Sequence, residues 1–107
     1  MHLSCVILTH NRRVSLLAGL GRLHDAIGMR PGDWEAIVVD NASPDGSAEA
    51  VAHHYPGVRV VRRATNGGSV GRNDGAGRAR GRYLLFLDDD SCPAPGTAQR
   101  AVDHLDM

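Results

Sequence analysis

A chain of 107 residues is long enough for one domain with a modest core. Its twelve basic and twelve acidic side chains balance, so no overall charge favours nucleic acid or an anionic membrane surface as a partner. All twelve cations are arginine, which excludes mechanisms that need a lysine, such as P-loop phosphate binding and Schiff-base chemistry.

The chain begins with a pattern that predicts a strand followed by a helix. Residues 3–9 are apolar and β-favouring, and they predict the first strand. A polar turn follows at residues 10–13. Apolar residues then recur on one face of a predicted helix, which Gly28 and Pro31 end: Leu16, Leu20, Leu23 and Ile27.

A second strand and helix are predicted next. Residues 36–40 read as a buried strand that ends on an acid. Ser47 is expected to be the N-cap of a short helix that runs to Tyr55. The residues expected to face inward from this helix are Ala48, Val51, Ala52 and Tyr55. Residues 58–61 predict a short third strand.

The last third of the chain predicts a glycine-rich helix, a strand and a final helix. Residues 66–81 are rich in glycine and arginine, and we expect a loop there followed by a loose helix near residues 70–79. Residues 82–87 predict a fourth strand, buried on both faces. Thr97 is expected to cap a last helix that extends through Leu105.

Strands that alternate with helices predict an α/β fold with a mainly parallel sheet, Rossmann-like, with helices on both faces. Residues 1–107 contain no clear domain boundary and no segment long enough to cross a membrane. Cys5 and Cys92 read as reduced thiols rather than as a disulfide framework. We therefore expect a location in the cytoplasm or at the inner face of the membrane.

Polar residues follow three of the predicted strands. Thr9 ends the first strand, Asp40 ends the second, and Asp88–Asp90 follow the fourth. Because the carboxyl ends of parallel strands lie at one edge of a sheet, these side chains are expected to converge on one crevice. Three adjacent carboxylates repel one another and offer hard oxygen ligands, which suit Mg²⁺ or Mn²⁺.

The chain resembles the inverting glycosyltransferases of family 2, which have the GT-A fold. Four segments carry this resemblance, in the family's order and at its approximate spacing: residues 6–12 (VILTHNR), 37–47 (IVVDNASPDGS), 66–68 with 71–73 (NGG and GRN), and 81–90 (GRYLLFLDDD). The resemblance implies strand order 3-2-1-4 and a nucleotide-diphospho-sugar donor. It implies transfer with inversion to an acceptor that is a glycan, a lipid-linked sugar or another molecule.

The resemblance also implies roles for individual residues. Thr9 is similar to the family residue that lines the base and ribose pocket, and Asp40 to the acid that hydrogen-bonds the base. Arg72 resembles the arginine near the base and diphosphate. Asp88 and Asp89 resemble the ribose-side part of the DXD motif, and Asp90 its metal-binding acid.

The family's general base lies well downstream of the DXD motif, so it is expected beyond Met107. Residues 1–107 then read as the nucleotide-diphospho-sugar-binding part of a GT-A domain, truncated before the acceptor-binding half. Such a truncation could leave a face through which the chain associates with itself. Asp103 and Asp106 do not match the base motif.

Other interpretations remain open from the sequence. The chain could be a non-catalytic fragment or assembly module that binds nucleotide weakly or not at all. Asp88-x-Asp90 after an apolar strand also resembles haloacid-dehalogenase-like phosphatases, although their downstream lysine is absent. At single residues, Asp88–Asp90 could be a solvated turn, Asp40 a capping acid, and Arg72 a solvated surface arginine.

Overall fold

A computed structural model describes the backbone of residues 1–107 and all side chains except that of Ser69. In this described chain, four strands form one parallel sheet in the order β3-β2-β1-β4, which confirms the expected order and direction. The strands are β1 (Leu3–Thr9), β2 (Trp34–Asn41), β3 (Arg59–Arg63) and β4 (Tyr83–Asp88).

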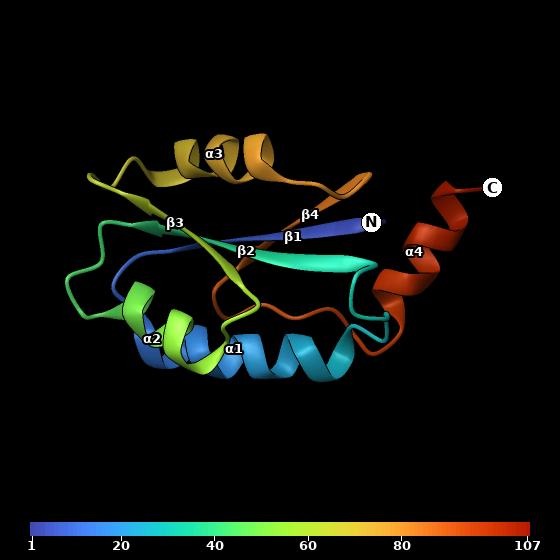
Figure 1. Ribbon diagram of the computed structural model, residues 1–107, viewed down its shortest axis with the longest axis horizontal. Helices are drawn as coiled ribbons and strands as arrows, with labels where there is room; N and C mark the ends of the chain where they lie inside the picture. The colour runs from blue at the N-terminus through green and yellow to red at the C-terminus, as the bar shows by residue number, and fades with distance from the viewer.

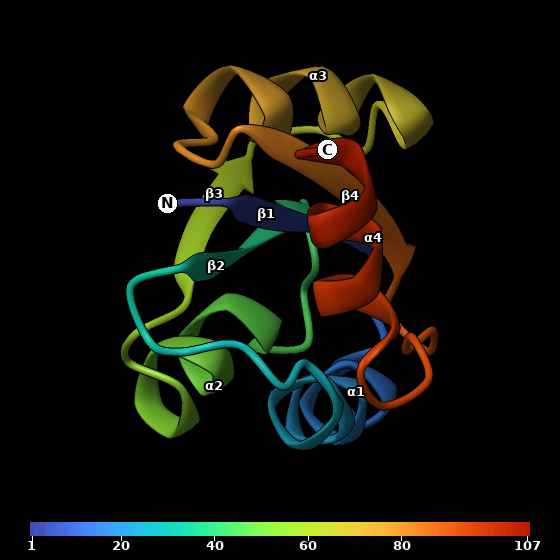
Figure 2. The same ribbon diagram turned by 90° about the vertical axis from the view of Figure 1, so that its right-hand side faces the viewer.

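Helices cover both faces of this sheet, as the sequence predicts. They are α1 (Arg13–Ala26), α2 (Ser47–His54), α3 (Gly71–Arg78), which follows the short 3-10 turn η1 (Gly68–Val70), and α4 (Thr97–Leu105). The helices α1 and α2 lie on one face and α3 on the other, while α4 lies beside the amino ends of β1 and β4 (Figures 1 and 2). No helix in the described part of the chain is long and apolar enough to cross a membrane.

The larger part of the core lies between the sheet and α1. Leu16, Leu20 and Leu23 are each 1% exposed, so the predicted apolar face of this helix is confirmed. They pack with alternate residues of β1 and β2, among them Cys5 and Val38. Cys5 and Cys92 are free, and burial raises the pKa of the Cys5 thiol to about 12, so this thiol stays neutral.

Helix α3 approaches the other face of the sheet through two glycines one turn apart, Gly71 and Gly75. A Cβ atom at Gly71 would lie 2.6 Å from Leu8 Cδ1, and one at Gly75 would overlap Val6. Because such contacts leave no room for a methyl group, glycine at both positions lets the helix rest directly on β1 and β2. The glycine-rich composition of this segment therefore has a packing function.

The strand β4 differs from the expectation that both of its faces are buried. Leu84 is 42% exposed and Phe86 is 43% exposed, whereas Leu85 and Leu87 pack against the core. The reason is position in the sheet, because β4 is an edge strand and α3 packs over β1, β2 and β3 (Figure 2). The resulting alternation is typical of a strand that is covered on one face.

Details of the remaining elements also differ from the sequence prediction. The N-cap residues are Gly46 and Gly96, both with positive φ, and Ser47 and Thr97 are the first helical residues. The capping side chain of α2 is that of Asp45, which accepts hydrogen bonds from the backbone N–H (3.1 Å) and the hydroxyl of Ser47. Two further corrections are that Ala52 is exposed and that β3 runs from Arg59 to Arg63.

The amino ends of the strands are connected through a buried carboxylate, Glu35 of β2. Its oxygens accept hydrogen bonds from the Ser4 hydroxyl (2.6 Å), the Arg80 backbone N–H (2.7 Å) and the Arg59 guanidinium (2.9 Å). The Ser4 hydroxyl in turn accepts one from the Gly81 N–H (2.8 Å). This network joins β1, β2, β3 and the segment before β4 at the edge opposite the carboxyl ends.

Candidate functional site

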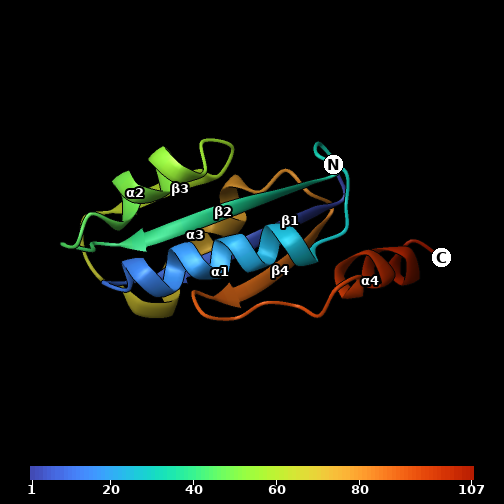
Figure 3. The same ribbon diagram turned by 90° about the horizontal axis from the view of Figure 1, so that it is seen from below.

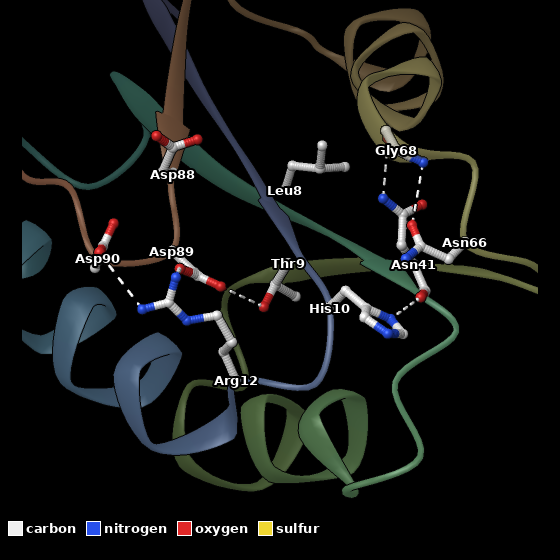
Figure 4. A pocket seen from close by; sticks show the side chains of 10 residues that line it. All are labelled: Leu8, Thr9, His10, Arg12, Asn41, Asn66, Gly68, Asp88, Asp89 and Asp90. Carbon is white, nitrogen blue, oxygen red and sulfur yellow. Dashed lines mark hydrogen bonds and ion pairs between the residues drawn. The ribbon is translucent and has the colours of Figure 1, made fainter.

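A pocket of about 410 Å³ opens at the carboxyl ends of the strands. Its volume lies within the range usual for small-molecule sites. Its walls come from the ends of β1, β2 and β4, the turn after β1 and the loop before α3 (Figure 4). The lining residues are Leu8, Thr9, His10, Arg12, Asn41, Asn66, Gly68, Asp88, Asp89 and Asp90.

The register of the sheet brings these residues together. β1 lies between its two neighbours, and Leu8 is paired with Val39 of β2 and with Asp88 of β4. All three strands therefore end at the same edge, although residues 9 and 89 are 80 positions apart in the sequence. The expected convergence is observed for Thr9 and for the three consecutive aspartates.

One end of the pocket is acidic, but its three carboxylates have different environments. Asp89 is 6% exposed, whereas Asp88 and Asp90 are 69% and 55% exposed. The Thr9 hydroxyl donates a hydrogen bond to Asp89 Oδ2 (3.0 Å). The Arg12 guanidinium lies between Asp89 and Asp90, with Nη1 3.4 Å from Asp89 Oδ1 and Nη2 3.5 Å from Asp90 Oδ2 (Figure 4).

Arg72, in the first turn of α3, is not part of the pocket lining, but it contacts a residue that is. Its Nη2 lies 3.7 Å from Asp88 Oδ1. The same guanidinium lies 5.9 Å from the centre of the Phe86 ring, within the distance of a cation–π contact. Arg72 therefore stands at the rim of the acidic end.

The other end of the pocket is formed by amides and an imidazole. The side chain of Asn41 is buried, and its Nδ2 donates a hydrogen bond to the Gly68 carbonyl (3.1 Å). Its Oδ1 has no hydrogen-bond partner among the residues that the structure describes. His10 Nδ1 donates to the Asn41 carbonyl (2.6 Å), and Asn66 Oδ1 accepts from the Gly68 N–H (3.1 Å). An unpaired acceptor in a buried amide is costly unless a ligand satisfies it.

Asp40 does not line the pocket, unlike the other residues that end β1, β2 and β4. It is 3% exposed, and its Oδ1 accepts a hydrogen bond from the Ser43 backbone N–H (3.1 Å). The structure places Asn41 in the pocket lining, and Asp40 stabilises the turn that follows β2.

A family model described as "Glycosyl transferase family 2" matches residues 4–107, nearly the whole chain. The chain belongs to glycosyltransferase family 2. This membership confirms the resemblance carried by the four sequence segments. It leaves the phosphatase interpretation without support.

Relatives and solved structures agree with this assignment. An uncharacterized glycosyltransferase of Haemophilus influenzae is 31% identical over 106 residues, covering 98% of this chain and 35% of the relative. The structure of S. aureus TarS 1–349 in complex with UDP-GlcNAc superposes with a TM-score of 0.85 at 27% identity, covering 99% of this chain and 31% of that one. A Pyrobaculum calidifontis mannosyltransferase in complex with GDP-Man and Mn²⁺ has a TM-score of 0.84 at 26% identity, with coverages of 97% and 32%.

These neighbours are GT-A glycosyltransferases, so the expected fold class is confirmed. The chain spans about a third of the length of each of these three proteins. The two solved structures are complexes with a nucleotide sugar, UDP-GlcNAc in one and GDP-Man with Mn²⁺ in the other.

The acidic end fits a divalent cation that is coordinated by only one or two protein side chains. No group of three or more His, Cys, Asp or Glu side chains that could hold a metal ion occurs among the described residues. Asp89 and Asp90 nevertheless already share one cation, the Arg12 guanidinium. Mg²⁺ in phosphate-binding sites commonly uses one or two carboxylates and completes its shell with phosphate oxygens and water. The donor set present is consistent with that arrangement.

The sequence alone assigns Arg12 and Asn41 to turns, whereas both line the pocket. The available signal was their position, because each comes within three residues of the end of a strand that leads to the site. What the sequence could not supply was the direction of each side chain. That direction depends on the register of the pleat and on the positive φ of Asn11, which turns the chain before Arg12.

Proposed function

We propose that residues 1–107 form the donor-binding part of a metal-dependent glycosyltransferase. The donor is a nucleotide-diphospho-sugar, the cation is Mg²⁺ or Mn²⁺, and the sugar is transferred with inversion to a hydroxyl of a glycan, a lipid-linked sugar or another acceptor. Membership of family 2 and the nucleotide-sugar complexes of two structural neighbours support this proposal.

The observation that carries the proposal is the polarity of the pocket along its length. Carboxylates and Arg12 lie at one end, and the unpaired Asn41 amide oxygen lies at the other, with Leu8 and Thr9 between them (Figure 4). A nucleoside diphosphate has the matching polarity, since its base presents N–H groups and its other end carries phosphates. The pocket therefore suits such a ligand lying across the end of β1.

At the acidic end, Asp90 would hold the cation and Asp88 would face the ribose, as expected from the sequence. Asp89, expected on the ribose side, is here proposed to join Asp90 at the cation, because the Arg12 guanidinium already contacts both carboxylates. The metal, when bound, acts as a Lewis acid that neutralises the charge developing on the leaving diphosphate. Thr9 fixes the orientation of Asp89 through its hydroxyl. Arg72, already beside Asp88, is placed to donate a bidentate contact to a phosphate.

At the amide end, we assign the base contact to Asn41, and Asp40 acts behind it by holding the turn. Nδ2 of Asn41 already donates to Gly68, and its unpaired Oδ1 is buried beside Gly71, so the proposed contact needs a shift of this amide that exposes Oδ1. The residue then offers one acceptor and no free donor. A single acceptor fits the one imide N–H of uracil or thymine. Guanine presents two donor groups side by side and would leave one of them unpaired. The proposed donor is accordingly a uridine or thymidine diphospho-sugar.

The general base that deprotonates the acceptor is proposed to lie outside residues 1–107. Asp106, the C-cap of α4, accepts hydrogen bonds from the Tyr83 hydroxyl (2.7 Å) and from Arg82, and Asp103 within α4 accepts one from Gln99. This helix lies at the amino end of the sheet, on the far side from the pocket (Figure 3). Neither carboxylate is therefore placed to act on a sugar bound at the carboxyl ends.

Calorimetry of the chain with UDP, TDP and GDP, each with and without Mn²⁺, tests this function. We expect Mn²⁺-dependent binding of UDP or TDP that is about five- to 160-fold tighter than that of GDP, because one unpaired donor costs about 1–3 kcal/mol. Asp90→Ala is expected to abolish the Mn²⁺ dependence with little change in stability, since Asp90 is exposed. Asp103→Ala is the matched control and should bind as the unaltered chain does.

Unchanged affinity in Asp90→Ala would refute the assignment of the metal to that carboxylate. Absence of Mn²⁺-dependent binding of every nucleoside diphosphate would favour the second candidate function, a non-catalytic fragment or assembly module. That alternative draws on the fact that the chain spans only about a third of its relatives' length.

A further inference from the structure

The proposed metal ligands are not free carboxylates, because Arg12 is bound to both of them. Its two terminal nitrogens lie 3.4 Å from Asp89 and 3.5 Å from Asp90. Arg12 comes directly before α1 and lines the pocket itself, so its guanidinium reaches the acidic end from the pocket wall (Figure 4). The other oxygen of Asp89 is taken by Thr9.

The contacts that hold Arg12 are weak enough to be exchanged. The side chains of Arg12 and Asp90 are about half exposed, at 51% and 55%, and both ion-pair distances exceed those of a close charged hydrogen bond. The Arg12–Asp90 pair is exposed on both sides, so water screens it and it contributes little to stability. The Arg12–Asp89 pair is partly buried, because Asp89 is 6% exposed, and it is the stronger of the two contacts. A divalent cation carries twice the charge and approaches a carboxylate oxygen to about 2.1 Å, so it would outcompete the guanidinium.

We propose that Arg12 is a resident counter-ion of the acidic end, which a divalent cation displaces and which then binds the donor's phosphates. The backbone of Arg12 is held by the start of α1, where its carbonyl accepts a hydrogen bond from the Leu16 N–H (2.9 Å). A displaced guanidinium therefore stays within the pocket. Its planar fork matches phosphate oxygens. This inference rests on the proposed function and adds an order of events to it. The metal first displaces Arg12 from the carboxylates, and the Arg12 guanidinium then binds the diphosphate.

The test compares two affinities in variants of Arg12. Free Mn²⁺ is measured by electron paramagnetic resonance without nucleotide, and UDP binding is measured by calorimetry at saturating Mn²⁺. Arg12→Gln removes the competing charge, so we expect Mn²⁺ alone to bind about three- to tenfold more tightly and UDP to bind more weakly by a similar factor. Arg12→Lys keeps the charge without the fork, so only the UDP affinity should fall.

Arg13→Gln is the matched control. The neighbouring Arg13 guanidinium is directed away from the pocket, to the carbonyl of Asp45 (3.1 Å), so both affinities should remain unchanged. Tighter Mn²⁺ binding in Arg12→Gln supports the inference even where the unaltered chain binds Mn²⁺ too weakly to detect. Equal Mn²⁺ affinities in the unaltered chain and Arg12→Gln overturn the inference and leave the proposed function standing. Absence of Mn²⁺ binding in both also overturns the inference, whereas the proposed function is overturned only if UDP binding by the unaltered chain does not depend on Mn²⁺.

Discussion

At the scale of single residues, Glu35 shows how much one buried carboxylate can organise. It is buried at the amino end of β2 and accepts hydrogen bonds from three other segments. Burial by itself raises the pKa of Glu35, but the hydrogen bonds from Ser4, Arg80 and Arg59 outweigh it, and the pKa lies below its ordinary value of 4.5. The folded chain therefore binds this proton less tightly than the unfolded chain does.

This difference predicts a pH dependence of stability. The contribution of ionised Glu35 is fully present above the unfolded pKa and is lost as the pH falls through the lower folded pKa. Glu35→Gln should lower the free energy of unfolding by about 1–3 kcal/mol at neutral pH, because a charged acceptor is removed from three donors. Urea unfolding at several pH values should show this gap closing as the pH is lowered below the ordinary pKa of 4.5.

Glu49→Gln serves as the control for Glu35. Glu49 is 60% exposed and pairs with Arg62 at the surface, so its loss should change the unfolding free energy by less than about 1 kcal/mol. The difference in unfolding free energy between Glu35→Gln and the unaltered chain should therefore depend on pH. A difference that is the same at every pH would show that the charge of Glu35 does not stabilise this network.

The neighbours Asp40 and Asn41 show what the sequence does and does not determine at this scale. That a polar pair ends a buried strand, and that it lies near Thr9 and the aspartates, follows from the strand pattern alone. Which of the two lines the pocket depends on tertiary contacts, because Asp40 accepts the Ser43 N–H of the following turn while Asn41 contacts Gly68 of the loop before α3. Local sequence carries no information about those contacts.

At the scale of elements, the approach of α1 to the loop after β4 positions the acidic end. A Cβ at Gly19 would overlap the backbone carbonyl of Asp89. The helix therefore lies directly against the backbone that presents the aspartates, and Figure 3 shows the chain running back from β4 along α1 toward α4. The Gly96 N–H donates to the Ala26 carbonyl (3.3 Å) and fixes the far end of this loop.

Gly19→Ala should accordingly affect both stability and binding. Alanine favours a helix over glycine by about 1 kcal/mol, but the collision with Asp89 should cost about 1–3 kcal/mol and displace the aspartates. We expect a net loss in the free energy of unfolding and weaker Mn²⁺-dependent UDP binding. Chemical denaturation and calorimetry of the same preparation measure the two effects.

Gly77→Ala is the matched substitution in α3, where an added Cβ meets no atom within 4 Å. It should stabilise the chain by about 0.5–1 kcal/mol and leave binding unchanged. If Gly19→Ala were stabilised to the same extent as Gly77→Ala, the contact between α1 and Asp89 would have no energetic importance.

Element types and order could be predicted from the sequence because periodicity records them directly, as the face of Leu16, Leu20 and Leu23 illustrates. The helix starts were wrong by one residue, because Gly46 and Gly96 supply left-handed turns that replace capping by Ser47 and Thr97. The burial of β4 was also wrong. An apolar run of that length is compatible with both a central and an edge strand, and neighbouring elements decide between them.

At the scale of the whole molecule, the sheet is covered unevenly. β4 is the last strand of the described sheet, and Leu84 and Phe86 project from its uncovered face with exposures of 42% and 43%. Exposed apolar side chains on an edge strand promote association between chains. The sequence analysis expects self-association through a truncated face, and we predict that the face of Leu84 and Phe86 is the one involved.

Sedimentation velocity over a range of concentrations measures this behaviour. We expect concentration-dependent association that is reduced in the double variant Leu84→Thr with Phe86→Thr, since threonine keeps the β preference and removes apolar surface. Val14→Thr is the control, because Val14 is 79% exposed on α1, on the other face of the sheet. Equal association of the double variant and the unaltered chain would place the contact elsewhere.

The strand order also sets the distance between the two ends of the pocket. Asn41 belongs to β2 and the aspartates follow β4, with β1 between them, so two strand spacings, together about 10 Å, separate the two halves of the pocket. The backbone hydrogen bonds between the strands set this distance, and a side-chain substitution does not change it. Natural selection or an engineer can therefore exchange the amide at one end or the acids at the other independently. Under the proposed function, a substitution at the amide end would change the base preference and leave the alignment of the phosphates unchanged.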